Sequence, residues 1–564
     1  MSHDRAAIAV GAAFLLLYRL TAAPGLLFAD SGELQTVAMA GGIPHATGYP
    51  LWVALAHAFT WLPFGAPEFR VTLFSAVCGA AALGLLVRRL GEMGVGLAAS
   101  VTAACFLGVT FSFWRVSVRA EVYTLSALVA LIAFGAVLGA VRGQGALAAG
   151  GRGAPPAATS SRVATASAPA APSRGPLLRA AFLVGIALLV HLSFAPVVAV
   201  AGLALAWHAW RAAPGDLPRL PLVLGAFLLG LTPYLLLVAL DASGVRANYL
   251  DLVREAGALL GIAEPPIESP WQGVWWLVTG RNVHPPQPMG FHPRSILAMF
   301  PNAAAVLFLF ELGPVGLLLM LLGLARRGRR DRGLALGLAA AFITSLGFTA
   351  WLQFGPMLHL FILPAILIGA ILVADGIDGV IGWAAGVRRS SARIPVAALI
   401  LWAALALPPA ILRAHAEERP IGAGGWRVVE EDPEFRAGFV PGMQRDRGAE
   451  TWARAALEAF PRDALVLARW THYTPLRHLQ ELEGRRADLT LRQISIPTLA
   501  PRLRRWQEAH DLASAPIVFA AADARLAPYL GGADSIALPG GRFACVIRRP
   551  LADILIDPVP ADIR

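Results

Sequence analysis

Two short polar segments near the start of the chain carry the residue types that acid–base chemistry needs. The first follows Phe28 and reads Asp30-Ser31-Gly32-Glu33, and the second reads Gly42-Ile43-Pro44-His45 and continues to Tyr49-Pro50-Leu51. Both come directly after the first apolar stretch of membrane length, residues 6–27, and so in what must be the first extramembrane loop. A carboxylate pair at a bilayer surface is costly unless something is bound or deprotonated there. We therefore expect the functional site in this loop.

Composition indicates that a membrane domain must position these residues. Of the 564 residues 57% are hydrophobic and 15% charged, and the mean hydropathy is +0.61, which excludes an ordinary soluble domain. The chain has no lysine, so all 47 basic residues are arginine. Its net charge of +11 fits arginine clusters on cytoplasmic loops, and we expect no nucleic-acid partner. Cys78, Cys105 and Cys545 indicate no disulfide framework.

Roughly 20 apolar residues make one helical crossing, and on that basis the chain has about eleven spans. The first is expected to be a retained span and not a cleaved signal peptide. The fifth and sixth share one apolar stretch that is broken at residues 191–196, where a re-entrant turn is possible. The spans are expected at 6–27, 70–88, 94–113, 121–141, 178–192, 193–210, 220–240, 296–323, 333–353, 356–374 and 395–412.

The arginine distribution fixes the expected orientation. With the N-terminus inside, every strong cluster falls on a cytoplasmic loop, as the positive-inside rule requires. The acidic loop, the tight 114–121 loop, the 241–295 segment and the C-terminal region then lie outside. The clusters are Arg88-Arg89, 142–174, Arg211 with Arg219, 326–332 and 388–393.

Three stretches outside the spans differ in character. Residues 142–176 are rich in Ala, Gly, Pro and Ser and are expected to form a flexible cytoplasmic loop. Residues 241–295 hold Tyr249, Trp271, Trp275 and Trp276, which predicts an ordered external loop with a helix at headgroup level. Residues 413–564 alternate short apolar runs with helical patterns. We therefore divide the chain into a membrane domain, 1–412, and a small external α/β domain, 413–564.

The α/β interpretation depends on five segments of the C-terminal region. Strands are expected at 464–468, 487–491 and 516–520, and helices at 475–482 and 501–512.

These motifs resemble a bacterial family of membrane proteins related to protein O-mannosyltransferases, within the GT-C glycosyltransferase superfamily. The likeness is strongest over residues 10–210 and continues at Tyr473-Thr474-Pro475-Leu476 to Asp488. Where acidic residues usually precede that Pro-Leu, this chain has Arg469, Trp470, Thr471 and His472, and Ala46-Thr47 replaces a proline-rich step. The motifs are Asp30 to Glu33, Gly42 to His45, Phe113-Trp114, Arg119-Ala120-Glu121-Val122-Tyr123 and His191-Leu192.

The resemblance implies a GT-C membrane fold in which a lipid-phosphate sugar meets an acceptor at the external face. Inverting transfer needs a carboxylate that takes the acceptor proton, and groups that hold the leaving phosphate. Asp30 is the expected base, by analogy with the acidic residue of the first external loop in GT-C enzymes. Glu33 would orient the acceptor or a partner of Asp30. The alternative is that Asp30-Ser31-Gly32 only caps an interfacial helix.

Other residues are expected to bind donor or acceptor, each with a structural alternative. His45 could instead pin a turn, Arg115, Arg119 and Glu121 could be a snorkelling set, and His191 could be a satisfied core histidine. The full binding set is His45, Tyr49, Arg115, Arg119, Glu121, Tyr123, His191 and Arg281.

Donor class and cofactor follow from what the motifs contain. There is no Walker motif, no CxxC and no histidine cluster. No Asp-x-Asp motif lies near the loops, which favours a lipid-phosphate donor over a nucleotide sugar. Metal dependence stays open, because Asp30 and Glu33 could bind a divalent cation.

The sequence thus predicts a polytopic glycosyltransferase of the bacterial inner membrane. Its donor would be a polyprenyl-phosphate sugar, with mannose as the family's suggestion, and its acceptor a hydroxyl on an exported protein. Two alternatives remain: a transporter or lipid flippase in which Asp30 and Glu33 couple to protons, and a GT-C enzyme with a glycan or lipid acceptor. Against the transporter, the acidic pair lies outside the expected bilayer and no inverted repeat is visible.

Overall fold

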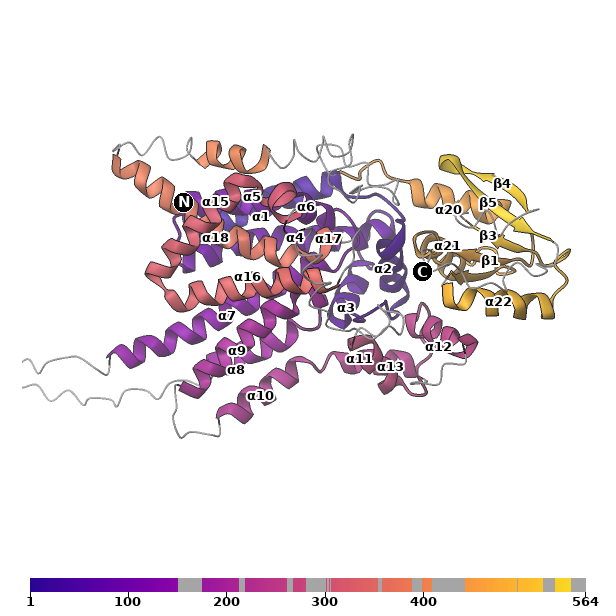
Figure 1. Cartoon of the computed structure of the whole chain (residues 1–564), viewed down its shortest axis with the longest axis horizontal. Helices are drawn as coiled ribbons and strands as arrows, with labels where there is room; N and C mark the ends of the chain where they lie inside the picture. The colour runs from indigo at the N-terminus through magenta and orange to yellow at the C-terminus, as the bar shows by residue number, and fades with distance from the viewer. Residues whose placement is uncertain are drawn as a thin grey trace, which may run out of the picture.

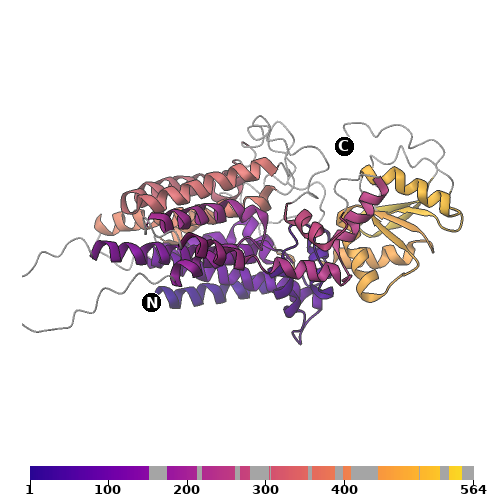
Figure 2. The same cartoon turned by 90° about the horizontal axis from the view of Figure 1, so that it is seen from below.

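The structure is a computed structural model of the whole chain. It describes residues 1–150, 175–211, 219–260, 267–279, 301, 304, 306–352, 358–387, 398–407, 442–494, 496–520 and 533–548. Most of the expected cytoplasmic loop 142–176, the 412/413 domain boundary and Arg281 therefore lie outside the described residues. Helices aligned in one bundle form the larger part of the molecule, and a small α/β unit lies beyond one end of that bundle (Figures 1 and 2).

The described helices follow the apolar segments of the sequence. The bundle is made of these elements: α1 (His3–Thr21), α4 (Pro67–Glu92), α5 (Leu97–Val109), α6 (Phe111–Ser117), α7 (Tyr123–Gly150), α8 (Gly175–Ile186), η1 (Leu192–Phe194), α9 (Ala195–Arg211), α10 (Arg219–Gly230), α11 (Tyr234–Ala242), the π-helix η2 (Val306–Leu312), α15 (Gly313–Arg330), α16 (Arg332–Leu352), α17 (Leu358–Phe361) and α18 (Leu363–Val387). The mainly α, multi-pass character that the composition predicts is confirmed.

The span count by helix length is smaller than the expected eleven. Within the described residues four helices are long and apolar enough to cross a membrane, and six if each of two bent pairs is one span. The first bent pair is α5 with α6, at 70°, and the second is α10 with α11, at 42°. Several expected spans are instead short or broken helices, as at residues 187–194, where the chain leaves α8 before it begins α9. The predicted number came from counting apolar stretches. A break inside such a stretch divides it into helices that are each shorter than one membrane crossing.

At one end of the bundle, ion pairs and hydrogen bonds of charged side chains connect four segments. Arg327 forms a buried ion pair with Asp375 (2.6 Å) and donates to the backbone carbonyl of Met93 (3.0 Å). Asp378 accepts from Arg326 (2.6 Å) and from the Gly96 amide (3.0 Å). This end contains the Arg88 to Glu92 turn and the start of α1, as predicted from the arginine clusters.

The opposite end carries short helices that the sequence did not separate. They are α2 (Ala29–Ala40), α3 (Pro50–Phe59), α12 (Tyr249–Leu260) and α13 (Pro270–Val278). The expected first loop is therefore largely helical. In α13 the predicted helix of the 241–295 segment is present, and Trp271 and Trp275 are each 63% exposed, one turn apart. Such an aromatic pair suits a membrane surface, because its rings are apolar and its N–H groups are polar.

The α/β unit contains a five-stranded mixed sheet. The strands are β1 (Leu465–Ala468), β2 (Thr490–Gln493), β3 (Ile517–Phe519), β4 (Asp534–Leu538) and β5 (Arg542–Ile547), in the order β2-β1-β3-β5-β4. The first three are parallel, and β5 and β4 add antiparallel. Its helices are α20 (Gly448–Ala459), α21 (Trp470–Glu483) and α22 (Ile496–Ala509). The expected α/β character is confirmed, although β2 begins three residues later than predicted, and the β4–β5 pair was not predicted.

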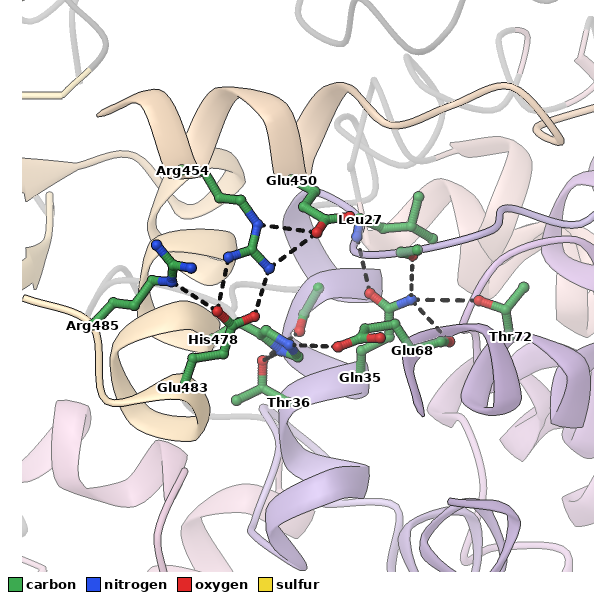
Figure 3. A network of polar contacts seen from close by, with 12 residues as sticks. Leu27, Gln35, Thr36, Glu68, Thr72, Glu450, Arg454, His478, Glu483 and Arg485 are labelled. Atoms are coloured by element: carbon green, nitrogen blue, oxygen red, sulfur yellow. Dashed lines mark hydrogen bonds and ion pairs between the residues drawn. The ribbon is translucent and has the colours of Figure 1, made fainter. Parts of the chain in front are cut away.

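A polar network fixes the α/β unit to the bundle (Figure 3). The buried imidazole of His478 in α21 lies 2.9 Å from Thr36 Oγ1 in α2 and 3.1 Å from Glu68 Oε1 in α4. Beside it, the Gln35 side chain accepts from the Leu27 amide (2.9 Å) and donates to the Gly25 carbonyl (3.0 Å). Because these side chains are buried, each bond satisfies a group that would otherwise be costly.

Apolar contacts and a close backbone approach complete this junction. Phe28, at the start of α2, packs against Trp452 and His472, and Arg542 lies over its ring at 5.0 Å. A Cβ atom on Gly32 would lie 2.2 Å from the Leu27 carbonyl oxygen and 3.0 Å from Thr474 Oγ1. The glycine of the Asp-Ser-Gly-Glu motif is therefore required mainly by the Leu27 carbonyl before α2, and it also leaves room for Thr474 of α21.

Candidate functional site

Asp30 lies in the first turn of α2, where that helix meets the α/β unit. The N-cap residue is Phe28 and makes no side-chain cap bond, so Asp30 does not cap the helix, and the capping alternative is wrong. Its Oδ1 instead accepts from the indole Nε1 of Trp470, at 2.6 Å. The Asp30 side chain is only partly buried. One carboxylate oxygen is thus held by a donor from the other end of the chain.

Glu33 lies one turn further along α2 and binds His45. Its Oε1 accepts from the His45 backbone amide at 2.9 Å, and its Oε2 accepts from His45 Nδ1. The other ring nitrogen, Nε2, lies 3.2 Å from the hydroxyl of Tyr49. Glu33 is buried, so its role in the structure is to hold the imidazole.

The charges around His45 favour its protonated form. Burial lowers the pKa of this histidine, but the carboxylates of Glu33, Asp30 and Glu121 together raise it by more, so that its pKa is raised to about 9. An opposite charge at hydrogen-bond distance has this effect on any basic group. His45 is therefore an imidazolium at neutral pH, with its Nδ1–H bonded to Glu33 and its Nε2–H directed at the Tyr49 hydroxyl.

The His45 segment is positioned by a neighbouring chain segment. Ile43 donates to the Ala247 carbonyl (3.2 Å) and accepts from the Tyr249 amide (2.8 Å), which forms a one-residue parallel bridge. A Cβ atom on Gly42 would lie 2.6 Å from the carbonyl oxygens of Arg246 and Ala247, so only glycine fits. The bridge also brings Tyr249 beside His45, with ring centroids 6.4 Å apart.

Arg119 and Glu121 reach α2 from the segment between α6 and α7. Ser31 Oγ donates to Glu121 Oε1 (3.0 Å) and lies 3.2 Å from Arg119 Nε, which donates to it. Arg119 and Glu121 are 5% and 6% exposed. The snorkelling alternative is therefore wrong for both, because their side chains are buried and bonded to Ser31 of α2. Burial raises the pKa of Glu121 to about 6, although Arg119 opposes the shift.

His191 is placed by the break between α8 and η1. Its Nε2 lies 3.2 Å from the Tyr123 hydroxyl, and its Nδ1 accepts from the Ser193 amide at 3.1 Å. Its ring stacks on Tyr49 at a centroid distance of 5.8 Å. This histidine is therefore a satisfied buried group that lies beside Tyr49, and its binding role stays a prediction.

Arg115 is the remaining described member of the expected set. It lies in α6, partly buried, and its charge lowers the pKa of Glu121 in the same network. The structure thus brings Asp30, Glu33, His45, Tyr49, Arg115, Arg119, Glu121, Tyr123 and His191 into one region.

Two residues beside Asp30 and His45 adopt a backbone conformation that is rare outside glycine. Ala29 has φ 54° and Tyr49 has φ 39°. Such positions cost of order 1–3 kcal/mol each and persist where the surroundings impose them, often at functional sites. Both lie next to chemistry-bearing side chains.

The sequence missed Ser31, Tyr249 and Trp470 as site residues. Ser31 stood inside the quoted motif, and Trp470 in the stretch where the chain departs from the family pattern. Within the described residues, no three His, Cys, Asp or Glu side chains are grouped as a metal site would require.

Comparison with known proteins places the similarity in this region. Residues 30–213 match the family described as the protein O-mannosyl-transferase TMEM260 N-terminal domain. The chain is 35% identical over 125 residues to protein O-mannosyl-transferase TMEM260 of Mus musculus, an alignment that covers 22% of this chain and 18% of the mouse protein.

Solved structures that align with this chain include the following two. The apo oligosaccharyltransferase of Archaeoglobus fulgidus aligns with a TM-score of 0.46 and 12% identity, over 87% of this chain and 64% of the other. ArnT of Cupriavidus metallidurans in the apo state aligns with a TM-score of 0.34 and 13% identity, over 96% and 97%. The resemblance indicated by the motifs is confirmed at the level of sequence: the chain is related to the protein O-mannosyltransferases through the region that contains Asp30, Glu33, His45, Arg119, Glu121 and His191.

Proposed function

We propose that this protein is an integral-membrane glycosyltransferase of the GT-C type. It would move a hexose such as mannose from a polyprenyl-phosphate donor to a hydroxyl group of an exported protein, at the external face of the membrane. The match to an O-mannosyl-transferase family over residues 30–213 supports the reaction class. The observation that carries the proposal is the Asp30 carboxylate, partly exposed, with one oxygen held by Trp470.

Asp30 suits the role of general base better than the other carboxylates of the site. Glu33 is buried with both oxygens bonded to His45, and Glu121 is buried against Ser31. Asp30 uses Oδ1 for the Trp470 bond and is only partly buried. A base must lie within hydrogen-bond reach of the proton it takes, and Asp30, unlike Glu33 and Glu121, is not fully buried.

The reaction is a single displacement. The acceptor oxygen attacks the anomeric carbon as Asp30 takes its proton. The bond from that carbon to the phosphate oxygen breaks, and its electron pair leaves with the polyprenyl phosphate. One attack from the face opposite the phosphate inverts the anomeric centre. Only one carboxylate is needed as base, in agreement with the commitment of Glu33 to His45.

Positive charge near Asp30 would stabilise the leaving phosphate. His45 is held protonated by its carboxylate neighbours, and Arg119 and Arg115 lie in the adjoining network. Donors that are already oriented lower the barrier most, since nothing must reorganise as charge develops. We assign the phosphate to the side of the site that contains His45 and Arg119.

Reconstitution tests this proposal. The purified protein in liposomes is given a polyprenyl-phosphate hexose, with radiolabelled sugar, and acceptors that are protein, glycan or lipid. Transfer to a serine- or threonine-containing protein supports the proposal. Transfer only to a glycan or lipid would support the glycosyltransferase activity and contradict the proposed protein acceptor. Movement of labelled lipid between leaflets without transfer would overturn the proposal in favour of a flippase.

A further inference from the structure

Trp470 belongs to the C-terminal α/β unit, yet its indole lies against the candidate base of the membrane domain. We propose that Trp470 is a positioning residue, which orients Asp30 for acceptor deprotonation and makes the active site a composite of both parts of the chain. This inference rests on the proposed function. It assigns a role to a residue that neither the sequence motifs nor the family match covers, because that match ends at residue 213.

The contact itself is short and directed. Trp470 Nε1 donates to Asp30 Oδ1 at 2.6 Å, and a hydrogen bond to an ionised carboxylate is about twice as strong as a neutral one. An indole has a single donor and no acceptor, so it fixes one oxygen without competing for the acceptor proton. The second oxygen remains for the substrate hydroxyl.

The indole is held in its orientation by aromatic neighbours from three segments. Tyr473, one helical turn further along α21, stacks on it at 6.1 Å. Tyr249 at the start of α12 meets it edge-on at 5.9 Å, and His45 meets it edge-on at 6.4 Å. Edge-to-face and stacked ring pairs have defined geometry, so together they restrict the ring plane and the direction of the N–H bond.

The location of Trp470 follows from how α21 is docked. Trp470 is the first residue of α21, after the N-cap Arg469, and Asp30 is in the first turn of α2. Two turns along α21, His478 bonds Thr36 of α2 and Glu68 of α4, which fixes the two helices to each other. The docking of α21 on α2 therefore places the Trp470 indole next to the Asp30 carboxylate. The Trp470–Asp30 hydrogen bond forms only when the α/β unit is docked on the bundle.

The test compares two Trp→Phe variants in the full-length, reconstituted protein. W470F removes the N–H donor and keeps an aromatic ring. W506F is the matched control, because Trp506 Nε1 donates to the Ala515 carbonyl (3.0 Å) inside the same α/β unit. We expect W470F to lower kcat roughly tenfold or more, with KM changed less than about twofold, since misplacing a catalytic group costs rate and not binding. W506F should retain its kcat, and W470H, which restores an N–H donor, should recover part of it.

A double-mutant cycle separates positioning from a general structural role. If Trp470 acts through Asp30, W470F has no further effect on kcat in a D30N background. The same cycle measured on thermal unfolding in detergent should also show coupling between the two residues. W470F as active as W506F, or full additivity with D30N, would overturn the inference. If Trp470 and Asp30 are coupled in thermal unfolding but the wild-type protein transfers no hexose, the proposed function is overturned. The catalytic role of Trp470 is then overturned as well.

Discussion

Glu33 accepts hydrogen bonds from both the backbone amide and the imidazole of His45, so its whole carboxylate is committed to one histidine. The ion pair fixes a positive charge within the candidate site. It also explains why two carboxylates one helical turn apart have different roles. Both oxygens of Glu33 are bonded to His45, whereas Asp30 uses only Oδ1, for its bond to Trp470.

The ion pair of Glu33 and His45 leads to a prediction of how the transfer rate depends on pH. His45 has a pKa raised to about 9, so it should stay protonated through neutral pH and lose its charge as pH rises through about 9. We expect kcat/KM to fall on that alkaline side. E33Q removes the largest charge that raises the pKa, so the fall should move toward the ordinary histidine value near 6.5. Rate profiles of both proteins check this, and an alkaline limb that E33Q does not move would disprove the role of the pair.

The same shift has a consequence for stability. Because the folded pKa of His45 is raised, its contribution is fully present below the unfolded value and is lost as pH rises from about 6.5 through 9.

Removal of the candidate base is the most direct test of the chemistry. D30N should cut turnover about a hundredfold or more, the usual scale for a general base, with the yield of folded protein unchanged. D251N is the control, because Asp251 is an exposed carboxylate on α12 that pairs with Arg254. Single-turnover assays with labelled donor make the measurement. An active D30N protein would move the base to Glu121 or Glu33.

The junction between bundle and α/β unit should depend on His478. H478A leaves Thr36 and Glu68 without this partner, and losing a buried partner costs about 1–3 kcal/mol. We expect a lower thermal midpoint, faster proteolysis after α18 and reduced transfer. The control H510A removes an exposed histidine that stacks on Trp506 in the same unit. If both variants have equal midpoints and equal transfer, the junction does not depend on His478.

Cysteine labelling tests the topology. In a background without Cys78, Cys105 and Cys545, A66C and A487C are exposed positions at the end of the molecule that contains α2 and α21. Both should react with a membrane-impermeant maleimide in intact cells. S2C, at the start of α1, should react only after permeabilisation. Labelling of A66C and A487C from opposite sides would refute the predicted orientation and the enzyme together.

The sequence predicted those parts of the site that short motifs and apolar patterns encode. Asp30, Glu33 and His45 are close in the chain, and turn-forming glycine and proline residues mark their segment. The burial of Arg119 and Glu121 could not be predicted, because hydropathy gives neither the 70° bend between α5 and α6 nor the contact of the following segment with Ser31.

The α/β unit shows a similar division. The parallel strands β1 and β3 are buried apolar runs that the sequence reveals, and both were predicted, whereas the mostly half-buried β2 was predicted three residues too early. The outer strand β4 has exposed residues and little apolar pattern, so periodicity gave no signal for it. The contact between Trp470 and Asp30 joins residues 440 apart, and nothing local to either residue encodes it.

The separation of 440 residues between Asp30 and Trp470 also determines when the two parts of the site are synthesised. Synthesis proceeds from the N-terminus at about 5–20 residues per second, so α2, which contains Asp30 and Glu33, is made some tens of seconds before α21. In that interval Asp30 lacks its Trp470 hydrogen-bond donor. The Trp470–Asp30 contact can therefore form only after the C-terminal α/β unit has been made and has docked, so the candidate site is completed at the end of synthesis.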